Sequence, residues 1–466
     1  MFRAQLRRRV ALSALLALST VSGRTQPLSL DVSPDDDLQA KVDRSPAGTT
    51  FRLKAGIYRL KTALIPKDGD SFIGEAGATV SGSQPLTVFG RSGNLWFVSN
   101  QSQHGQIHGS CRPAYVRCAY SEDLYIDNAM LRHVGSLADV APGRWFFDHD
   151  ANRIYFYDDP TGKTVETSVT PGAFGGRASH VTIQGLTIEK FANAAQSGAI
   201  AGESSDGWAV RANEIRFNHG AGIRIGPSMT VLRNVVHHNG QLGVGGIGDD
   251  VLVAENEIAY NNTAGFDPGW EAGGSKFVMT NALIVRSNFV HHNAGPGLWT
   301  DTDNRNVRYD SNRVEDNEGS GIFHEVSYDA AITNNTVRRN GFSASVWLWG
   351  AGILVAASPN VEVSANSVEG NFNGICAIQQ RRDSGAFGPY EVSNLWVHDN
   401  SVSSSGLTGL AQDFGDRSYF SRHNNHFDRN TYYFARNGRY FWWMDGPRTD
   451  TEWRGYGNDV SGTVNR

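Results

Sequence analysis

A six-residue phrase, Asn-x-[Ile/Val]-x-x-Asn, recurs seven times in this chain and constrains its fold more than any other feature. Successive copies begin 21, 22, 32, 24, 23 and 31 residues apart. A period of roughly 20 to 50 residues indicates a solenoid or a related repeat architecture. The copies begin at Asn213, Asn234, Asn256, Asn288, Asn312, Asn335 and Asn366.

The residues around each phrase predict short strands. Apolar and polar residues alternate before each copy, as in Leu283 and Val285 before Asn288, and this alternation is typical of half-buried strands. A glycine-rich turn and a second apolar pair follow, for example Gly297-Leu298. The repeat therefore predicts an all-β parallel β-helix, with coils about 4.8 Å apart. Recurring asparagines would form a ladder along the stack, since asparagine tolerates the left-handed conformation and bonds along the ladder.

Composition agrees with a narrow solenoid core. Only 39% of the residues are hydrophobic, whereas 52 are glycine, which suits a chain with many turns. The net charge of −5 argues against a general nucleic-acid surface, so no nucleic-acid partner is expected. A solenoid of this type is expected to be a monomer.

Residues 1–23 are predicted to be a secretory signal peptide. Arg3 and Arg7 to Arg9 form a basic start, Val10 to Val21 is an apolar run, and small residues end at Gly23. The apolar run is too short to span a bilayer, so no membrane partner is expected. We therefore predict a secreted or periplasmic protein.

The remaining chain divides into four predicted regions. These are an N-terminal cap with the first coils (27–85), an inserted aromatic-rich β-subdomain (86–170), the parallel β-helix (171–410) and a C-terminal capping region (411–466). Caps are needed because the end of a solenoid is an open sheet edge. Within the insertion, Cys111 and Cys118 are expected to form a disulfide in an exported protein, which leaves Cys376 as a buried free thiol.

Aligning the coils by their glycine-apolar pairs places Lys276, Asp301 and Glu325 roughly in one column. Ionised residues are confined to the centre of this column, and aromatic residues accompany them. Mixed aromatics and carboxylates on a solenoid face suit a polysaccharide or oligosaccharide substrate. The residues expected to contact this substrate are Trp270, Trp299, Asp303, His324 and Asp329.

Two chemistries fit this column, and both stay open. In glycoside hydrolysis, Asp301 and Glu325 on neighbouring coils would match the spacing of a retaining pair. In β-elimination of a polyuronate, Lys276 would be the base, and Glu271 with the two carboxylates could hold Ca²⁺. A non-catalytic carbohydrate-binding or surface protein, with a charge-paired ladder in place of a site, is the third hypothesis.

The chain resembles the secreted right-handed parallel β-helix proteins of the pectate-lyase-like superfamily over most of residues 27–410. The resemblance implies the right hand, and the fold hosts lyases, hydrolases, epimerases and adhesins. Glu271-Ala-Gly-Gly-Ser-Lys276 is similar to the Glu-x-x-x-x-Lys coil of polysaccharide lyase family 6, which implies a calcium-binding Glu271 and a basic Lys276. That family places an Arg-His pair on the next coil, where this chain has Trp299-Thr-Asp301; Arg305 is the nearest substitute. The aromatic insertion looks more like that of β-helix glycoside hydrolases. Cleavage of a polysaccharide by elimination is the first prediction, and hydrolysis is the alternative.

Overall fold

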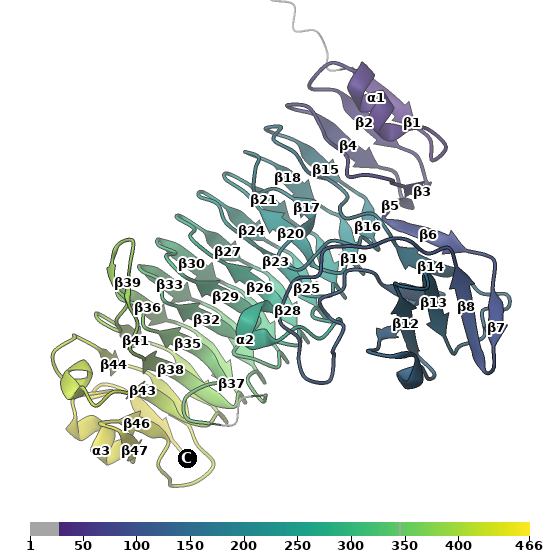
Figure 1. The fold of residues 1–466 in the computed structure, drawn as a ribbon. Coiled ribbons are helices and arrows are strands. Elements are labelled where there is room, and N and C mark those ends of the chain that lie inside the picture. Colours follow the sequence, from purple (N-terminus) through teal and green to yellow (C-terminus); the bar gives the residue numbers. More distant parts are fainter. Residues whose placement is uncertain (1–27, 344–345) are drawn as a thin grey trace, which may run out of the picture.

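The computed structural model describes residues 28–343 and 346–466; the predicted signal peptide lies outside the described residues. Each full coil contributes one strand to each of three long sheets, and the coils stack into an elongated rod (Figure 1). The first sheet has 13 strands, from β1 (Ser29–Val32) to β44 (His426–Asp428). The second sheet also has 13, from β3 (Gly56–Arg59) to β48 (Thr463–Asn465). The fold is an all-β parallel β-helix, as the repeat predicts.

The third sheet has 11 strands and carries the site discussed below. Its strands pair in parallel except the last two. They are β17 (Gly198–Ala201), β20 (Ala221–Ile225), β23 (Leu242–Gly246), β26 (Gly273–Phe277), β29 (Leu298–Asp301), β32 (Ile322–Glu325), β35 (Ala351–Ala356), β38 (Asn373–Gln379), β43 (Thr408–Gln412), β46 (Phe441–Trp443) and β47 (Gly446–Arg448).

The asparagines of the phrase form two buried ladders. Asn312 shows the pattern, since its backbone N and its Nδ2 donate to Oδ1 of Asn335 at 2.9 and 3.0 Å. Its own Oδ1 accepts the same two bonds from Asn288, at 3.1 and 3.0 Å. One detail differs from the expectation. The left-handed residue is the one before each asparagine, such as Ser311 (φ 57°), so the asparagine serves the ladder through its side chain alone.

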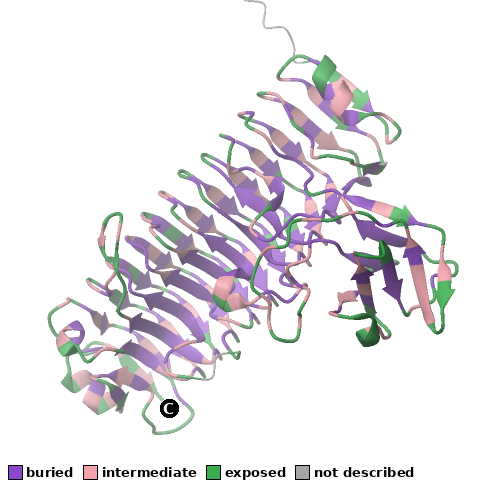
Figure 2. Ribbon diagram, in the orientation of Figure 1, coloured by how far each residue is buried: buried purple, intermediate pink, exposed green. Residues whose placement is uncertain are grey.

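The apolar residue of the phrase builds the core. Register partners on the second sheet place each of these side chains directly above the next, and all are fully or almost fully buried (Figure 2). Such a continuous column of branched side chains removes apolar surface from water along the whole rod. The column contains Ile215, Val236, Ile258, Val290, Val314, Val337 and Val368.

A β-subdomain leaves the second coil after β5 (Ala78–Ser81) and stands beside the rod (Figure 1). It has its own core, which includes the buried rings of Trp145, Phe147 and Phe156. Two small, mainly antiparallel sheets surround this core. Their strands are β6 (Ser83–Leu86), β9 (Leu124–Ile126), β10 (Ala129–Met130) and β14 (Val165–Ser168), and β7 (Gly90–Ser92), β8 (Leu95–Ser99), β11 (Arg132–His133), β12 (Arg144–Asp148) and β13 (Arg153–Phe156).

Both ends of the described rod are covered. Helix α1 (Leu38–Arg44) buries Leu38 and Val42 at the N-terminal end, and Asp37 caps it by accepting from the Ala40 amide at 2.9 Å. At the other end the rings of Trp443 and Trp453 pack 5.4 Å apart beside helix α3 (Asp450–Gly455). None of the helices in residues 28–343 and 346–466 is long and apolar enough to cross a membrane.

Candidate active site

Asp301 and Glu325 end two adjacent strands of the third sheet, β29 and β32, and are register partners. Parallel strands lie about 4.8 Å apart, so the two carboxylates stand side by side. The residues before them, Thr300 and His324, point into the core and are fully buried. Since side chains alternate along a strand, Asp301 and Glu325 point outward, where their side chains are 19% and 12% exposed.

Lys276 approaches this pair from strand β26. Its Nζ lies 2.8 Å from Oδ2 of Asp301 and 4.0 Å from the ring centroid of Trp299. It also donates to the carbonyl of Trp270 at 3.2 Å. The lysine and its two aromatic neighbours were predicted at the site, and the structure brings them together.

The predicted single column is wrong in one respect. Phe277 pairs with Thr300, which aligns Lys276 with Trp299 and places it two residues away from the Asp301 position. Counting from the asparagines fails because the turn between the third and first sheets varies in length between coils. The long lysine side chain spans the offset, so its contact with Asp301 survives.

Glu271, the last residue of helix α2 (Pro268–Glu271), is buried and held by nitrogen donors. Its Oε1 accepts from Arg224 at 3.0 Å, and its Oε2 accepts from Gln196 at 2.9 Å and lies 4.0 Å from Lys276 Nζ. A calcium ion needs six to eight oxygen ligands. The described residues contain no group of three or more candidate metal ligands, and a cation beside Arg224 and Lys276 would be repelled. The donor set therefore does not fit the predicted Ca²⁺.

Burial raises the pKa of Glu325 to about 7, and the neighbouring charge of Asp301 raises it further, while Arg382 and Lys276 oppose the shift. Arg382 NH2 lies 3.1 Å from Oε1 of Glu325. A carboxyl group with this pKa is protonated in an appreciable fraction of molecules at neutral pH, so it can donate a proton there.

Two site residues escaped the sequence analysis, Arg224 and Arg382. Arg224 is in register with Gly245, which pairs with Lys276, so a correct alignment of the coils would have found it. Arg382 is 57 residues from Glu325 on a loop after β38, and no repeat signal points to it. Asp303, predicted to bind substrate, instead anchors this loop: its Oδ1 accepts from Tyr390 OH at 2.6 Å and from the Ala386 amide at 3.0 Å.

Three further predicted residues lie away from the carboxylate pair. His324 faces the core, where burial lowers its pKa to about 3 and Thr300 Oγ1 lies 2.8 Å from its Nδ1. Asp329 accepts from Asn360 at 2.9 Å in an exposed turn beside β33 (Ala330–Thr333), and Arg305 stacks on Phe387 with its Cζ 4.4 Å from the ring centroid. Alternation along β32 turns His324 inward, and the turns after β29 and β32 carry the other two away.

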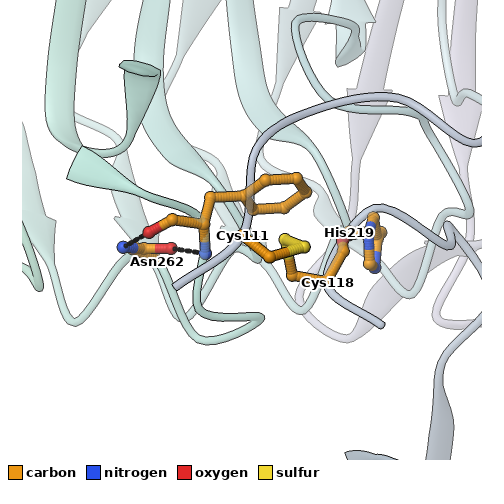
Figure 3. Close-up of a disulfide and its surroundings, with 5 residues drawn as sticks. Cys111, Cys118, His219 and Asn262 are labelled. Atoms are coloured by element: carbon orange, nitrogen blue, oxygen red, sulfur yellow. Dashed lines mark hydrogen bonds between the residues drawn. A yellow bond between two sulfur atoms is a disulfide. The ribbon is translucent and has the colours of Figure 1, made fainter. Parts of the chain in front are cut away.

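The predicted disulfide between Cys111 and Cys118 is present and fixes a loop of the β-subdomain next to helix α2 (Figure 3). Cys111 forms an isolated antiparallel bridge with Phe266, whose backbone N–H and C=O both bond the Asn262 side chain, at 2.8 and 2.9 Å. His219 Nε2 donates to the Cys118 carbonyl at 2.8 Å. The β-subdomain thus borders the segment that carries Trp270 and Glu271. Cys376 is free and buried, as expected.

Comparisons with known proteins agree with this fold. A family model described as a right handed beta helix region matches residues 197–352. The solved structure of XylC in complex with xylose aligns with a TM-score of 0.66 at 14% identity, over 94% of this chain and 86% of that chain. The A-module of the mannuronan C-5 epimerase AlgE6 of Azotobacter vinelandii aligns at 0.46 and 15% identity, over 92% of each chain. No curated protein matches the sequence.

These similarities define the class as right-handed parallel β-helix proteins. At 14% identity, the likeness to XylC establishes the fold and nothing about activity. The local resemblance to polysaccharide lyase family 6 stays a prediction.

Proposed function

We propose that the protein is an exported glycoside hydrolase that cleaves a neutral glycan with retention of configuration. Asp301 is the nucleophile and Glu325 is the acid/base. One observation carries the proposal: the two carboxylates are register partners on adjacent strands, and only Glu325 is held with a pKa of about 7. Retaining enzymes use two carboxyl groups about 5–5.5 Å apart, with one protonated and the other ionised.

In the first step, protonated Glu325 donates its proton to the glycosidic oxygen while a carboxylate oxygen of Asp301 attacks the anomeric carbon. The bond between that carbon and the glycosidic oxygen breaks, and the alcohol leaves with the donated proton. A glycosyl ester of Asp301 results. Lys276 contributes by orienting Asp301 through its 2.8 Å contact.

In the second step, ionised Glu325 takes a proton from a water molecule, and the water oxygen attacks the anomeric carbon. The ester bond to Asp301 breaks and returns its electron pair to the carboxylate. The product is a hemiacetal with the original configuration, because two inversions restore it. Glu325 ends the cycle protonated, ready for the next substrate.

Charge pairing at the site supports a neutral substrate. Arg224 contacts Glu203 and Glu271, each at 3.0 Å, and Lys276 contacts Asp301. These two cations are buried and already matched by carboxylates, so they have no surplus charge for a uronate. The xylose bound in the structurally similar XylC makes xylosides the first neutral substrates to test.

β-Elimination has less support. A base needs a free lone pair, but Lys276 Nζ donates to Asp301 and to the Trp270 carbonyl. Elimination also needs a group that neutralises the substrate carboxylate. Glu271 is already engaged by Arg224 and Gln196 and does not fit a calcium ligand. The sequence similarity around Glu271 and Lys276 is the remaining argument for it.

The test is turnover on a panel of neutral and acidic glycans, with reducing ends and ultraviolet absorbance recorded together, with and without chelator. We expect reducing ends alone, from a neutral member, unaffected by chelator. Asp301→Asn and Glu325→Gln should each lower turnover by about 10²–10⁴-fold. Asp310→Asn, a partly exposed carboxylate bonded to Asn334 on the first sheet, is the control and should retain activity.

An ultraviolet-absorbing product that depends on Lys276 would establish elimination and overturn the proposal. Absence of turnover on every glycan would leave a binding or surface protein. Turnover that survives both Asp301→Asn and Glu325→Gln would show that another pair of residues does the chemistry.

A further inference from the structure

A column of four rings lies outside the candidate active site. Phe217, His238, Tyr260 and His292 occupy the same position on four successive coils, each directly before an asparagine of the second ladder. The His238 and Tyr260 rings stack with centroids 5.0 Å apart, and the Tyr260 and His292 rings stack at 5.1 Å. Tyr260 is 44% exposed, so this column is not part of the hydrophobic core.

The column forms one wall of a cavity of about 630 Å³ between the rod and the β-subdomain. The other wall comes from the β-subdomain, through Tyr115, Asn128 and Met130. Ligand cavities commonly measure about 300–1,000 Å³ and occur where two structural units meet. Size and position are therefore those of a binding site.

The chemistry of the lining is uncharged. It contains no aspartate, glutamate, lysine or arginine, although 19% of the whole chain is charged. Burial lowers the pKa of His238, with a smaller contribution from the neighbouring His237, so its imidazole is neutral near pH 7. A neutral imidazole, a phenol and an amide each offer a hydrogen-bond donor and an acceptor, as a sugar hydroxyl does.

The stacking decides how a ligand would meet these rings. The faces of His238, Tyr260 and His292 are turned toward one another, so mainly their polar edges meet the cavity. Repetition at the coil spacing gives a row of such edges about 4.8 Å apart. A row of neutral donors and acceptors beside apolar ring carbons matches an extended chain of hydroxyl groups on an apolar sugar skeleton.

We propose that this cavity is a second carbohydrate site, which binds a neutral glycan chain apart from the place of cleavage. Asn262 and Thr263 line the cavity, and the same coil insertion ends at Trp270 and Glu271 beside the candidate active site. One polysaccharide could thus be held by the same segment of the protein at two places. Binding here does not require the hydrolysis proposed above.

Calorimetric titration of the full chain carrying Glu325→Gln tests this inference. The probes are xylohexaose, cellohexaose, mannohexaose and arabinohexaose, with trigalacturonate as the charged comparison. We expect a neutral hexaose to bind at a site that Tyr260→Ala or His292→Ala weakens by about tenfold or more, since a lost neutral hydrogen bond costs about 0.5–1.5 kcal/mol and lost ring contacts add to this. Tyr260→Phe keeps the ring and should weaken binding less.

Tyr433→Ala is the matched control, because Tyr433 is 48% exposed and lies on a distant coil in β45 (Thr431–Tyr433). It should leave binding unchanged. Binding of every neutral hexaose that is indifferent to Tyr260→Ala and His292→Ala would overturn the inference, as would no binding of any hexaose. Turnover of a short aryl glycoside by Tyr260→Ala should equal that of the wild type, which separates failure of this site from failure of the hydrolase proposal.

Discussion

The ammonium of Lys276 lies 2.8 Å from the carboxylate of Asp301 and 4.0 Å from the centroid of the Trp299 ring. Both contacts are largely shielded from water, since the Lys276 side chain is 9% exposed and that of Asp301 is 19% exposed. The lysine thus keeps Asp301 in place and covers one face of the indole. This makes it a positioning residue in the proposed hydrolysis.

Replacing Lys276 by methionine separates the two chemistries. In hydrolysis, Lys276→Met removes one charge-assisted hydrogen bond worth about 1.5–3 kcal/mol, so kcat should fall about 10- to 150-fold and remain measurable. In elimination the same change removes the base. In an Asp301→Asn background, Lys276→Met should have little further effect, because its partner is already changed. Complete loss of activity in Lys276→Met alone, with stability intact, would contradict the positioning role.

Activity should fall on the alkaline side of neutrality. Glu325 must be protonated to donate, and its pKa is about 7, so kcat/KM should decline as the pH rises through about 7. Arg382 lowers this pKa, so Arg382→Ala should move the decline to higher pH. The expected displacement is about 0.2–0.7 pH units, because an exposed ion pair is worth about 0.2–1 kcal/mol.

The neighbouring arginine offers a control for this pH effect. Arg381 stacks over Phe414, with its Cζ 5.6 Å from the ring centroid, so Arg381→Ala should leave the decline in place. Measured kcat/KM profiles from pH 5 to 9 decide the matter. A decline that does not move in Arg382→Ala would separate Arg382 from Glu325, and a profile without an alkaline limb would remove Glu325 as the acid.

Protein stability should depend on the same proton. The pKa of Glu325 rises from 4.5 to about 7 on folding, so the folded state favours the neutral form. This contribution is fully present below about pH 4.5 and is lost as the pH rises through about 7. Relative to Glu325→Gln, the wild type should therefore lose up to about 3 kcal/mol of unfolding free energy between pH 4.5 and 8. Urea unfolding at several pH values measures this difference, and parallel curves for the two proteins would refute it.

The asparagine ladder should dominate local stability. Asn312 is 1% exposed, so Asn312→Ala leaves the amides of Asn288 and the carbonyl of Val285 without their partner in a dry interior. Each unsatisfied buried group costs about 1–3 kcal/mol, so we expect a loss of about 3 kcal/mol or more in unfolding free energy. Asn281→Ala removes an exposed side-chain bond to Asn306 and should cost less than about 1 kcal/mol. Similar midpoints of thermal unfolding for the two variants would show that the ladder is not essential.

The repeat contained enough information for the fold. A strand-only period of 21 to 24 residues with paired asparagines leaves few alternatives to a parallel β-helix, and the ladders account for both asparagines of each phrase. The carboxylate pair was also predictable, because Asp301 and Glu325 both lie four residues after a coil glycine. The same alternation excludes His324 from the outer face, an inference that the sequence already permitted.

Other features of the site depend on geometry that a repeat does not encode. The offset of Lys276 follows from turn length, which differs from coil to coil. Arg382 reaches Glu325 from a loop whose position depends on Asp303 and Tyr390. The raised pKa of Glu325 arises from burial among neighbouring side chains, which no single residue type reveals.

The most direct test of the central claim is the configuration of the first product. Proton NMR of the reaction mixture, recorded within the first turnovers of an active neutral glycoside, distinguishes the two anomers before they equilibrate. We expect the anomer with the same configuration as the substrate, because Asp301 and Glu325 stand on adjacent strands at the spacing of a retaining pair. The inverted anomer would contradict a glycosyl ester on Asp301 and would require a water molecule between two more distant groups.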